Sequence, residues 1–379
     1  DHSKRIDVGL ILFPDPQPIQ ATTNQWAVGI DFGTTNSCIY VKENKDSPKQ
    51  LNFKKLYPSI LFPGKNQYHD KHTHVDGVSN ILNPINIFSW FRAKKIINNI
   101  NPDRIIISYW HFFFIPLYVY ILKNTKNVKR YVLFHNVLSH QRKSYEIYLL
   151  RWLLKHIDCC VVMNESAKKQ INEIDNNKKV IKTFHPLYLL DNNAHTKESA
   201  RKELGIVNSK VILFFGLIRP YKGLDNLIKA VKHLNSSLSD FTVVIAGENY
   251  ESMSKYYNLI NKLNLQEKFM FDLKFIDQNN TAKYFMASDI VVMPYKHGSQ
   301  SGVLSLAYNF NRPVIVTNVG GLSEYIVNGK TGFVVNDEKE LSNKIDYFFK
   351  EKLFEDMSSF IRDYKKQFSW EEFERKVNE

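Results

Sequence analysis

Two stretches in the second half of the chain combine positive side chains, small residues and predicted helix starts. In the first, "FFGLIRPYKGLDNLIKAV", Gly216 ends an apolar run, Arg219 and Lys222 follow it, and Gly223 precedes an amphipathic segment. Cations at the carboxyl end of a buried strand, close to a helix N-terminus, can bind a diphosphate. The alternative interpretation of the same residues is a solvated basic turn.

The second stretch is "MPYKHGSQSGVLSLAYNFNRPVIVTNVGGLSE". An apolar run leads into a loop from Gly298 to Gly302, and an apolar helix follows whose first amides could hold phosphate oxygens. A further strand and a Gly320-Gly321 turn then precede Glu324. Two loops suited to phosphate in one half of the chain favour a nucleoside diphosphate ligand over either loop taken alone.

The elements that must position these loops are visible as an alternation of short β-branched runs and longer amphipathic runs. Helices are predicted at 224–234 and 339–350. Strand-helix alternation indicates parallel sheets covered on both faces, and therefore an α/β architecture. The predicted strands are 104–110, 130–136, 159–166, 179–185, 210–216, 241–247, 268–274, 289–295 and 312–318.

One apolar stretch, residues 105–122, is 18 residues long without a formal charge, which is near the lower limit for a membrane-spanning helix. His111 and Pro116 interrupt it. Its first part has the β-branched composition of a buried parallel strand. We therefore expect a strand that leads into an apolar helix of the core, and no membrane span.

The composition is that of a soluble globular protein with two domains: 379 residues, 44% apolar and 23% charged. Three cysteines cannot form a disulfide framework, which favours a reducing, cytoplasmic compartment, and no metal-ligand spacing is visible. The net charge of +13 attracts anions such as phosphorylated substrates or an anionic membrane face. No arginine-rich, aromatic-interleaved motif is present, so we do not expect nucleic acid as a partner.

Taken together, "FFGLIRPYKGLD", "YFMASDIVVMPY", "SQSGVLSLAYNFNRPVIVTNVGGLSEYIVNGKTGFVV" and "FSWEEFERKV" resemble the C-terminal domain of GT-B glycosyltransferases of family 4. The resemblance continues upstream and covers residues 51–379. It implies two Rossmann-like domains that face a cleft: an N-terminal, acceptor-side domain at 51–193 and a nucleotide-sugar-binding domain at 194–361. A C-terminal helix at 362–379 would pack back on the N-terminal domain.

The resemblance assigns Arg219 and Lys222 the catalytic role of neutralising the leaving diphosphate, without a metal. Gly216 would approach the donor. His135, in "FHNVLSH", falls where relatives have a histidine near the reacting sugar, although it could also be a core or turn histidine. Glu324 could contact the donor or simply cap a helix start.

Many relatives carry a pair of glutamates around the Gly-rich loop, and this chain has Gly298 and Leu306 at those positions. Neither side chain can hydrogen-bond a sugar or ribose hydroxyl. The resemblance therefore implies that a variant loop takes over donor binding. Its residues are Gln300 and Ser301 together with the backbone amides of Gly302 and Val303.

The first fifty residues have a different character. "AVGIDFGTTNSCIYV", residues 27–41, resembles the phosphate hairpin of the chaperone, actin and sugar-kinase ATPase superfamily. The fifty residues are too few for a complete ATP cleft. The segment 1–50 stands where relatives have their first strand and Gly-rich loop. Either the hairpin replaces that first strand, or the chain is a fusion or relic with an incomplete cleft.

These observations lead to one expected function and two alternatives. The first is a retaining glycosyltransferase that moves a sugar from a UDP- or GDP-sugar to a glycan or lipid-linked acceptor, in bacterial surface polysaccharide synthesis at the inner face of the plasma membrane. It would need no cofactor or metal. The alternatives are a catalytically impaired nucleotide-sugar-binding protein and, from the hairpin alone, an ATP-binding chaperone-like module.

Overall fold

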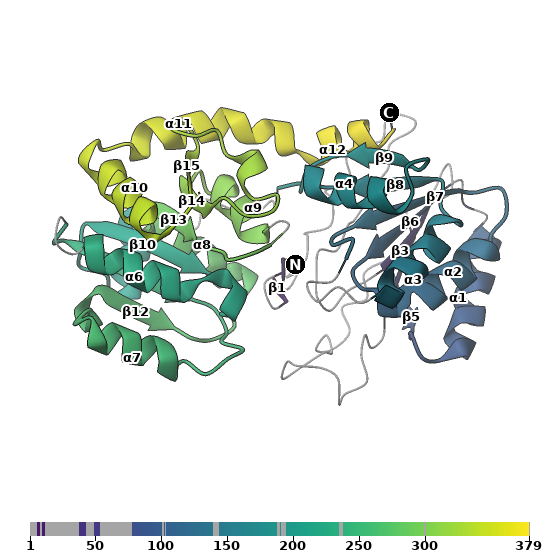
Figure 1. Ribbon diagram of the computed structural model, residues 1–379, viewed down its shortest axis with the longest axis horizontal. Coiled ribbons are helices and arrows are strands. Elements are labelled where there is room, and N and C mark those ends of the chain that lie inside the picture. The colour runs from purple at the N-terminus through teal and green to yellow at the C-terminus, as the bar shows by residue number, and fades with distance from the viewer. Residues whose placement is uncertain are drawn as a thin grey trace. The chain divides into compact units, whose positions relative to one another are not determined.

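The computed structural model describes residues 78–138 apart from 101 and 103, then 144–187, 190, 195–234, 238–298 and 301–378. Before residue 78 it describes only the backbone of four short strands. Two of these, β1 (Ile6–Asp7) and β2 (Leu10–Ile11), pair with each other in antiparallel fashion. The rest of the described chain forms two compact units, each an α/β structure (Figure 1).

Unit 1 comprises Leu12–Phe184 and Glu371–Glu379, and unit 2 comprises His185–Trp370. The elements of unit 1 are β3 (Cys38–Lys42), β4 (Lys49–Phe53), β5 (Val78–Leu82), α1 (Ile87–Ile100), β6 (Arg104–Tyr109), the 3-10 turn η2 (Phe112–Phe114), α2 (Ile115–Lys123), β7 (Lys129–Phe134), α3 (Ser144–Leu154), β8 (Cys159–Val162), α4 (Glu165–Ile174), β9 (Lys179–Lys182) and α12 (Trp370–Asn378).

The sheet of unit 1 has the strand order β5-β4-β3-β6-β7-β8-β9. Strands β6 to β9 are parallel to one another, as predicted, but β3 runs antiparallel to both of its neighbours. Only six residues join β3 to β4, and a connection that short can join only antiparallel strands. The last part of the hairpin-like stretch 27–41 thus supplies the strand beside β6, in reversed direction. Residues 25–37, with Asp31, lie outside the described residues.

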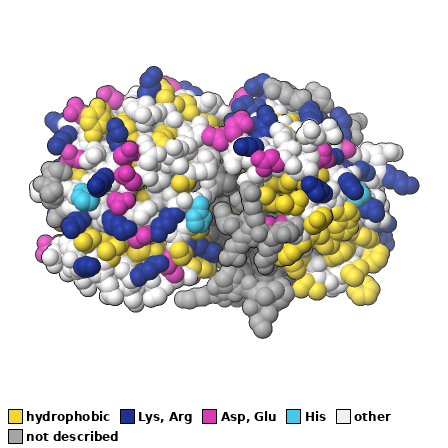
Figure 2. Space-filling model, in the orientation of Figure 1, with side chains coloured by type: hydrophobic (Ala, Val, Ile, Leu, Met, Phe, Trp, Pro, Cys, Tyr) yellow, Lys and Arg dark blue, Asp and Glu magenta, His cyan; other side chains and the backbone are white. Residues whose placement is uncertain are grey.

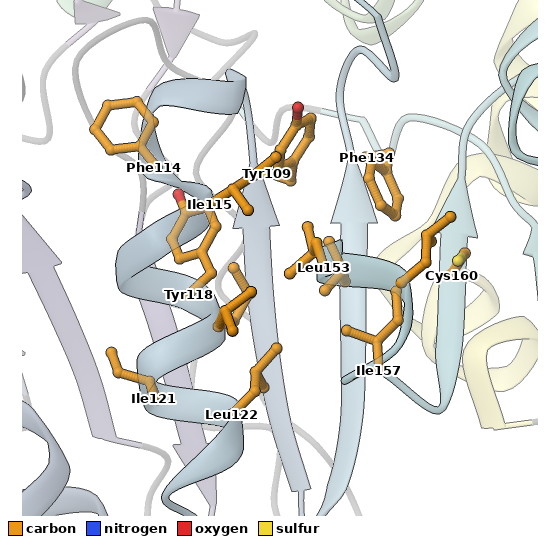
Figure 3. Packing of buried hydrophobic residues seen from close by; sticks show 14 of the residues in the cluster. Tyr109, Phe114, Ile115, Tyr118, Ile121, Leu122, Phe134, Leu153, Ile157 and Cys160 are labelled. Carbon is orange, nitrogen blue, oxygen red and sulfur yellow. The ribbon is translucent and has the colours of Figure 1, made fainter. Parts of the chain in front are cut away.

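The core of unit 1 lies between this sheet and its helices (Figure 3). Tyr109 of β6, Tyr118 of α2 and Leu153 of α3 are almost wholly buried within one cluster. The uncharged stretch 105–122 is confirmed as strand β6 followed by η2 and the core helix α2. Within the described part of the chain, no helix is long and apolar enough to cross a membrane.

Unit 2 contains a six-stranded sheet with the order β12-β11-β10-β13-β14-β15, parallel throughout. Its elements are α5 (Lys197–Leu204), β10 (Lys210–Phe215), η3 (Pro220–Lys222), α6 (Leu224–Leu234), β11 (Phe241–Ala246), α7 (Ser254–Lys262), η4 (Gln266–Lys268), β12 (Phe269–Asp272), α8 (Gln278–Ala287), β13 (Ile290–Met293), α9 (Gly302–Asn309), β14 (Val314–Thr317), η5 (Ser323–Tyr325), β15 (Gly332–Val335), α10 (Glu338–Lys350), α11 (Phe354–Tyr364) and η6 (Lys365–Phe368).

The division between the units falls between residues 184 and 185, nine residues before the position expected from the sequence. The segment after residue 184 belongs to unit 2 because its backbone is hydrogen-bonded there. Ser305 Oγ donates to Pro186 O at 3.0 Å, and Asn309 Nδ2 donates to Leu190 O at 3.2 Å. Polar composition marks a loop, but only these contacts decide to which core it belongs.

The chain returns to unit 1 at residue 371, inside α12. Phe373 of this helix packs edge-on against Phe184, with ring centroids 6.1 Å apart, and Lys376 Nζ lies 5.1 Å from the centre of the Phe184 ring. The domain border expected at residue 361 therefore falls within α11, which is still part of unit 2.

Candidate functional site

The candidate site in unit 2 is built at the carboxyl end of β10, where Gly216 follows the strand. Gly216 has φ = +88°, a conformation that glycine adopts without strain. A Cβ atom at this position would lie 2.9 Å from Lys222 Nζ and 3.5 Å from Val303 Cγ2. The missing side chain thus leaves room for the Lys222 ammonium group. Gly216, Lys222 and Val303, which the sequence predicts to bind the donor, are therefore neighbours.

Lys222 is a buried cation, with only 5% of its surface exposed. Burial, followed by the positive charge of Arg219, lowers the pKa of Lys222 to about 7. Its Nζ lies 5.5 Å from the centre of the Tyr295 ring, and no ion pair joins it to a carboxylate of the described residues. A buried cation without a counter-ion is costly, and an anion bound beside it would offset that cost.

Arg219 precedes the 3-10 turn η3 and is half-buried. The centre of its guanidinium group lies 4.9 Å from the centre of the Tyr250 ring, a cation–π contact that fixes its plane. Its Nε is buried and has no hydrogen-bond partner among the described residues. A buried donor without a partner is unusual in proteins and is a natural position for a ligand oxygen.

The start of α9 borders the same site. Ser301 caps the helix: its Oγ accepts a hydrogen bond from the backbone N–H of Val303 at 3.2 Å and shares one with the Tyr295 hydroxyl at 3.0 Å. The partial positive charge of a helix N-terminus favours a bound anion. Gln300, the other side chain expected to bind the donor, lies outside the described residues.

Tyr295, which was not predicted as a site residue, connects the two halves of the site. Its hydroxyl meets Ser301 while its ring lies over the Lys222 ammonium group. Burial, and then the neighbouring Tyr221, raise the pKa of Tyr295 well above its usual value, so it keeps its proton. The signal in the sequence was an aromatic residue at the end of the strand predicted at 289–295, three residues before the loop identified as ligand-binding.

The two loops are held together by a close backbone approach at Gly223. This residue has φ = +70°, and a Cβ atom on it would lie 1.9 Å from Pro294 O. No other residue type fits without moving one of the loops. Gly223 therefore sets the distance between the cations that follow β10 and the residues that follow β13.

Glu324 lies on the short turn η5 and its side chain is exposed.

Next to the cap of α9 is a pocket of about 370 Å³, part of which is open to solvent. Ser301 belongs both to this pocket and to the α9 start. The pocket is lined by His185, Leu187, Ser301, Leu304, Ser305, Tyr308, Leu322, Tyr325 and Phe368.

His135 lies in unit 1, directly after β7, and is 2% exposed. Its Nε2 is 2.8 Å from Ser108 Oγ, and its ring stacks on Trp110 with centroids 4.5 Å apart and planes 5° from parallel. These contacts fix the ring at the carboxyl edge of the sheet. His140, the weaker histidine candidate, lies outside the described residues.

The chain is similar in sequence to known glycosyltransferases. Residues 196–367 match the family model described as glycosyl transferases group 1. An uncharacterized glycosyltransferase of Methanocaldococcus jannaschii is 26% identical over 258 residues, 66% of this chain and 67% of that protein. A D-inositol 3-phosphate glycosyltransferase of Corynebacterium aurimucosum is 32% identical over 185 residues, 46% of this chain and 43% of that protein. The alignment thus spans less than half of the second relative.

Solved structures show that the α/β fold is that of GT-B glycosyltransferases. Sucrose-phosphate synthase from Thermosynechococcus elongatus aligns with a TM-score of 0.63 at 18% identity, over 76% of this chain and 75% of that chain. Anabaena HepE in complex with UDP and glucose aligns with a TM-score of 0.63 at 17% identity, over 79% of this chain and 84% of that chain. HepE was also solved in complex with UDP-glucose. At these identities the likeness establishes the fold alone.

Proposed function

We propose that the chain is a glycosyltransferase that transfers a sugar from a nucleotide-sugar donor to a glycan or lipid-linked acceptor. The observation that carries the proposal is Lys222: a buried ammonium group without a carboxylate partner among the described residues, next to Arg219 and the start of α9. A nucleoside diphosphate would supply the missing negative charge at this point. The match of residues 196–367 to a glycosyltransferase family model supports the same assignment.

The chemistry follows from where charge develops. When the bond between the sugar carbon and the oxygen of the β-phosphate breaks, negative charge grows on the leaving diphosphate. The acceptor hydroxyl attacks the electron-poor sugar carbon, and its proton passes to the leaving diphosphate. Lys222 and Arg219 would stabilise that charge better in the transition state than in the bound donor, which is the condition for catalysis. We propose that the chain's own cations do this without a metal.

The finer parts of the proposal rest on the family resemblance. They are transfer with retention of configuration, a place for His135 near the reacting sugar, a donor contact by Glu324 and a role in surface polysaccharide synthesis. For the donor we propose a UDP-sugar before a GDP-sugar, because the structurally similar HepE binds UDP and UDP-glucose.

A specific observation favours a second candidate, a nucleotide-sugar-binding protein without transferase activity. Strand β3 is antiparallel to β6, with Lys42 opposite Arg104. The carboxyl end of β3 is therefore at the edge where β6 begins, while His135 is at the opposite edge. A loop after β3 cannot reach the edge at which parallel strands place their functional loops.

A panel of ligands on the purified chain tests the proposal. UDP, GDP and ADP, and their glucose conjugates, are added at about 100 times their dissociation constant while thermal unfolding is followed. Binding at this excess contributes about 2.7 kcal/mol. For a unit the size of unit 2 this corresponds to a rise in melting temperature of about 5 to 10 °C.

The outcomes separate the candidates. A shift with one nucleotide series, together with sugar transfer or slow donor hydrolysis, supports the enzyme. A shift without any turnover selects the non-catalytic binder. If none of the six ligands moves the melting temperature, the nucleotide-sugar proposal is wrong.

A further inference from the structure

Unit 1 exposes large apolar side chains around the start of α1. Phe88 is 82% exposed, and Ile85, Ile87 and Phe91 are each more than half exposed. On the opposite side of the helix, Ala93 and Ile97 are fully buried in the core. The exposed residues are therefore not a core face left uncovered: α1 has one apolar face packed inward and a second, shorter one that faces solvent.

The exposed residues are held on a fixed backbone. Asn83 Oδ1 accepts hydrogen bonds from the N–H groups of Ile85 and Asn86, and Asn86 Oδ1 accepts one from the N–H of Phe88. The Ser89 hydroxyl donates to the backbone oxygen of Asn83 and accepts from the N–H of the same residue. This network fixes the backbone of the turn before α1, from which Phe88 projects.

Aromatic side chains extend this surface across α2 to α3. Phe91 contacts Tyr120 of α2 edge-on, with ring centroids 5.5 Å apart. Along α3, the residues Tyr145, Tyr148 and Trp152 follow one another on the exposed face of the helix. Figure 2 shows hydrophobic side chains gathered over these helices, with Lys and Arg near them. We call this surface, from Ile85 to Trp152, the α1–α3 face.

The charges on the α1–α3 face are of one sign. Helices α1, α2 and α3 carry five basic residues and a single acidic residue, Glu146, which is 1% exposed. The surface therefore combines exposed aromatic rings with positive charge and no exposed carboxylate of these helices. The basic residues are Arg92, Lys94, Lys95, Lys123 and Arg151.

We propose that the α1–α3 face binds the surface of an anionic lipid bilayer, with Phe88 and Phe91 entering the boundary between headgroups and acyl chains. Exposed aromatic and aliphatic side chains with basic neighbours are the composition of segments that lie in that boundary. Basic residues near the surface add attraction to anionic headgroups. The interaction is peripheral, since no helix of the described chain is long and apolar enough to span a bilayer.

A second copy of the chain is a less suitable occupant. In a two-fold symmetric dimer the same patch meets itself, so the positive side chains would face one another. Arg92 and Lys95, one turn after Phe88 and Phe91, have no carboxylate on α1 to neutralise them. An anionic lipid surface meets the apolar and the positive groups at once.

This inference goes beyond the donor chemistry, because the face lies wholly in unit 1 and uses no residue of the donor site. It adds to the proposed function a reason why a lipid-linked acceptor would be within reach. Membrane binding by the α1–α3 face and nucleotide binding by unit 2 are tested independently, because vesicle binding needs no nucleotide and nucleotide binding needs no vesicle.

The test is co-sedimentation of the full chain with vesicles of phosphatidylcholine alone or with 30% phosphatidylglycerol. We expect strong binding only to the anionic vesicles. The double variant Phe88→Ser with Phe91→Ser should bind these about 30-fold more weakly, since two rings no longer leave water. Val207→Ser is the matched control: Val207 is 95% exposed on unit 2, and its loss should change nothing.

The double variant Arg92→Ala with Lys95→Ala separates the contribution of charge to vesicle binding from the contribution of the inserted aromatic side chains. It should weaken binding to anionic vesicles about 20-fold and reduce the salt dependence. The melting temperature and nucleotide binding of each variant show that the fold and the donor site are intact. Equal binding to neutral and anionic vesicles, or wild-type binding by the Phe88/Phe91 variant, overturns the proposal. So does a dimer in solution that the same double variant dissociates.

Discussion

Replacing Lys222 with methionine is expected to stabilise unit 2 at pH 7 and to remove sugar transfer at the same time. Methionine fills a similar volume but carries no charge that must leave water. The pKa of Lys222 is about 7 against an ordinary value of 10.5. This difference corresponds to a gain of roughly 4 kcal/mol in the free energy of unfolding at pH 7. The loss in kcat/KM should be about 10³-fold, as for removal of a donor to a developing charge.

The free energy of unfolding of the wild type should rise with pH in a defined range. Between pH 7 and 10.5 the unfolded chain holds a proton on Lys222 that the folded chain has lost, so the wild type becomes more stable as the pH rises. The stabilisation by Lys222→Met should therefore be complete below pH 7 and largely gone near pH 10.5. Urea unfolding at pH 7 and at pH 10 measures it.

A matched control is Lys229→Met on α6, where the lysine is exposed and the variant should behave like the wild type at both pH values. A stability difference between wild type and Lys222→Met that does not change with pH would contradict a buried, uncompensated ammonium group. A variant with full transferase activity would remove Lys222 from the mechanism.

The second large effect is expected from Gly223→Ala. The new Cβ would stand 1.9 Å from Pro294 O, and the backbone also has φ = +70°. The loops after β10 and β13 must separate to admit it, which we expect to cost about 3 kcal/mol or more in the free energy of unfolding. Nucleotide binding should be lost as well, because Lys222 is the adjacent residue.

Gly205→Ala provides an unusually close control. Gly205 ends α5 with φ = +69°, nearly the same angle, but nothing lies within 4 Å of the position of its Cβ. Its substitution should cost only the conformational strain, about 1 kcal/mol. Urea denaturation of both variants separates strain from collision. Equal losses in the two variants would mean that the approach to Pro294 does not hold the site together.

Much of the fold could be predicted because its strands are short, apolar and bounded by polar or turn residues. All nine predicted strands are confirmed, and the helix predicted at 224–234 is α6 with the same bounds. One missed strand, β5, lacks that signal: it reads "VSNIL", with two adjacent polar residues.

The direction of β3 could not have been predicted from its composition. Its antiparallel pairing with β4 follows from the six residues that join the two strands, but β4 was not identified as a strand because "KQLNF" has no β-branched residue. The resemblance to GT-B glycosyltransferases indicated a displaced first strand. Only the pairing with β6 shows that the replacement is reversed.

The charged residues of the candidate site could be predicted from the sequence, but the burial of Lys222 could not. The sequence identified Arg219, Lys222 and the Gly-rich loop by type and spacing. The burial of Lys222 depends on the absent side chain of Gly216 and on the Tyr295 ring, which approach it from different segments of the chain. Contacts of this kind arise from the packing of whole elements, so spacing along the sequence cannot reveal them.

The role of Lys222 in diphosphate binding is tested most directly by the number of protons taken up when the nucleotide binds at pH 8. Calorimetry in buffers with different ionisation enthalpies measures it, with the nucleoside diphosphate that stabilises the chain most. At pH 8 the free Lys222 is mostly neutral, and a diphosphate beside it should restore its charge. We expect uptake of about 0.9 proton per nucleotide. Binding without proton uptake would show that the diphosphate does not meet the Lys222 ammonium group.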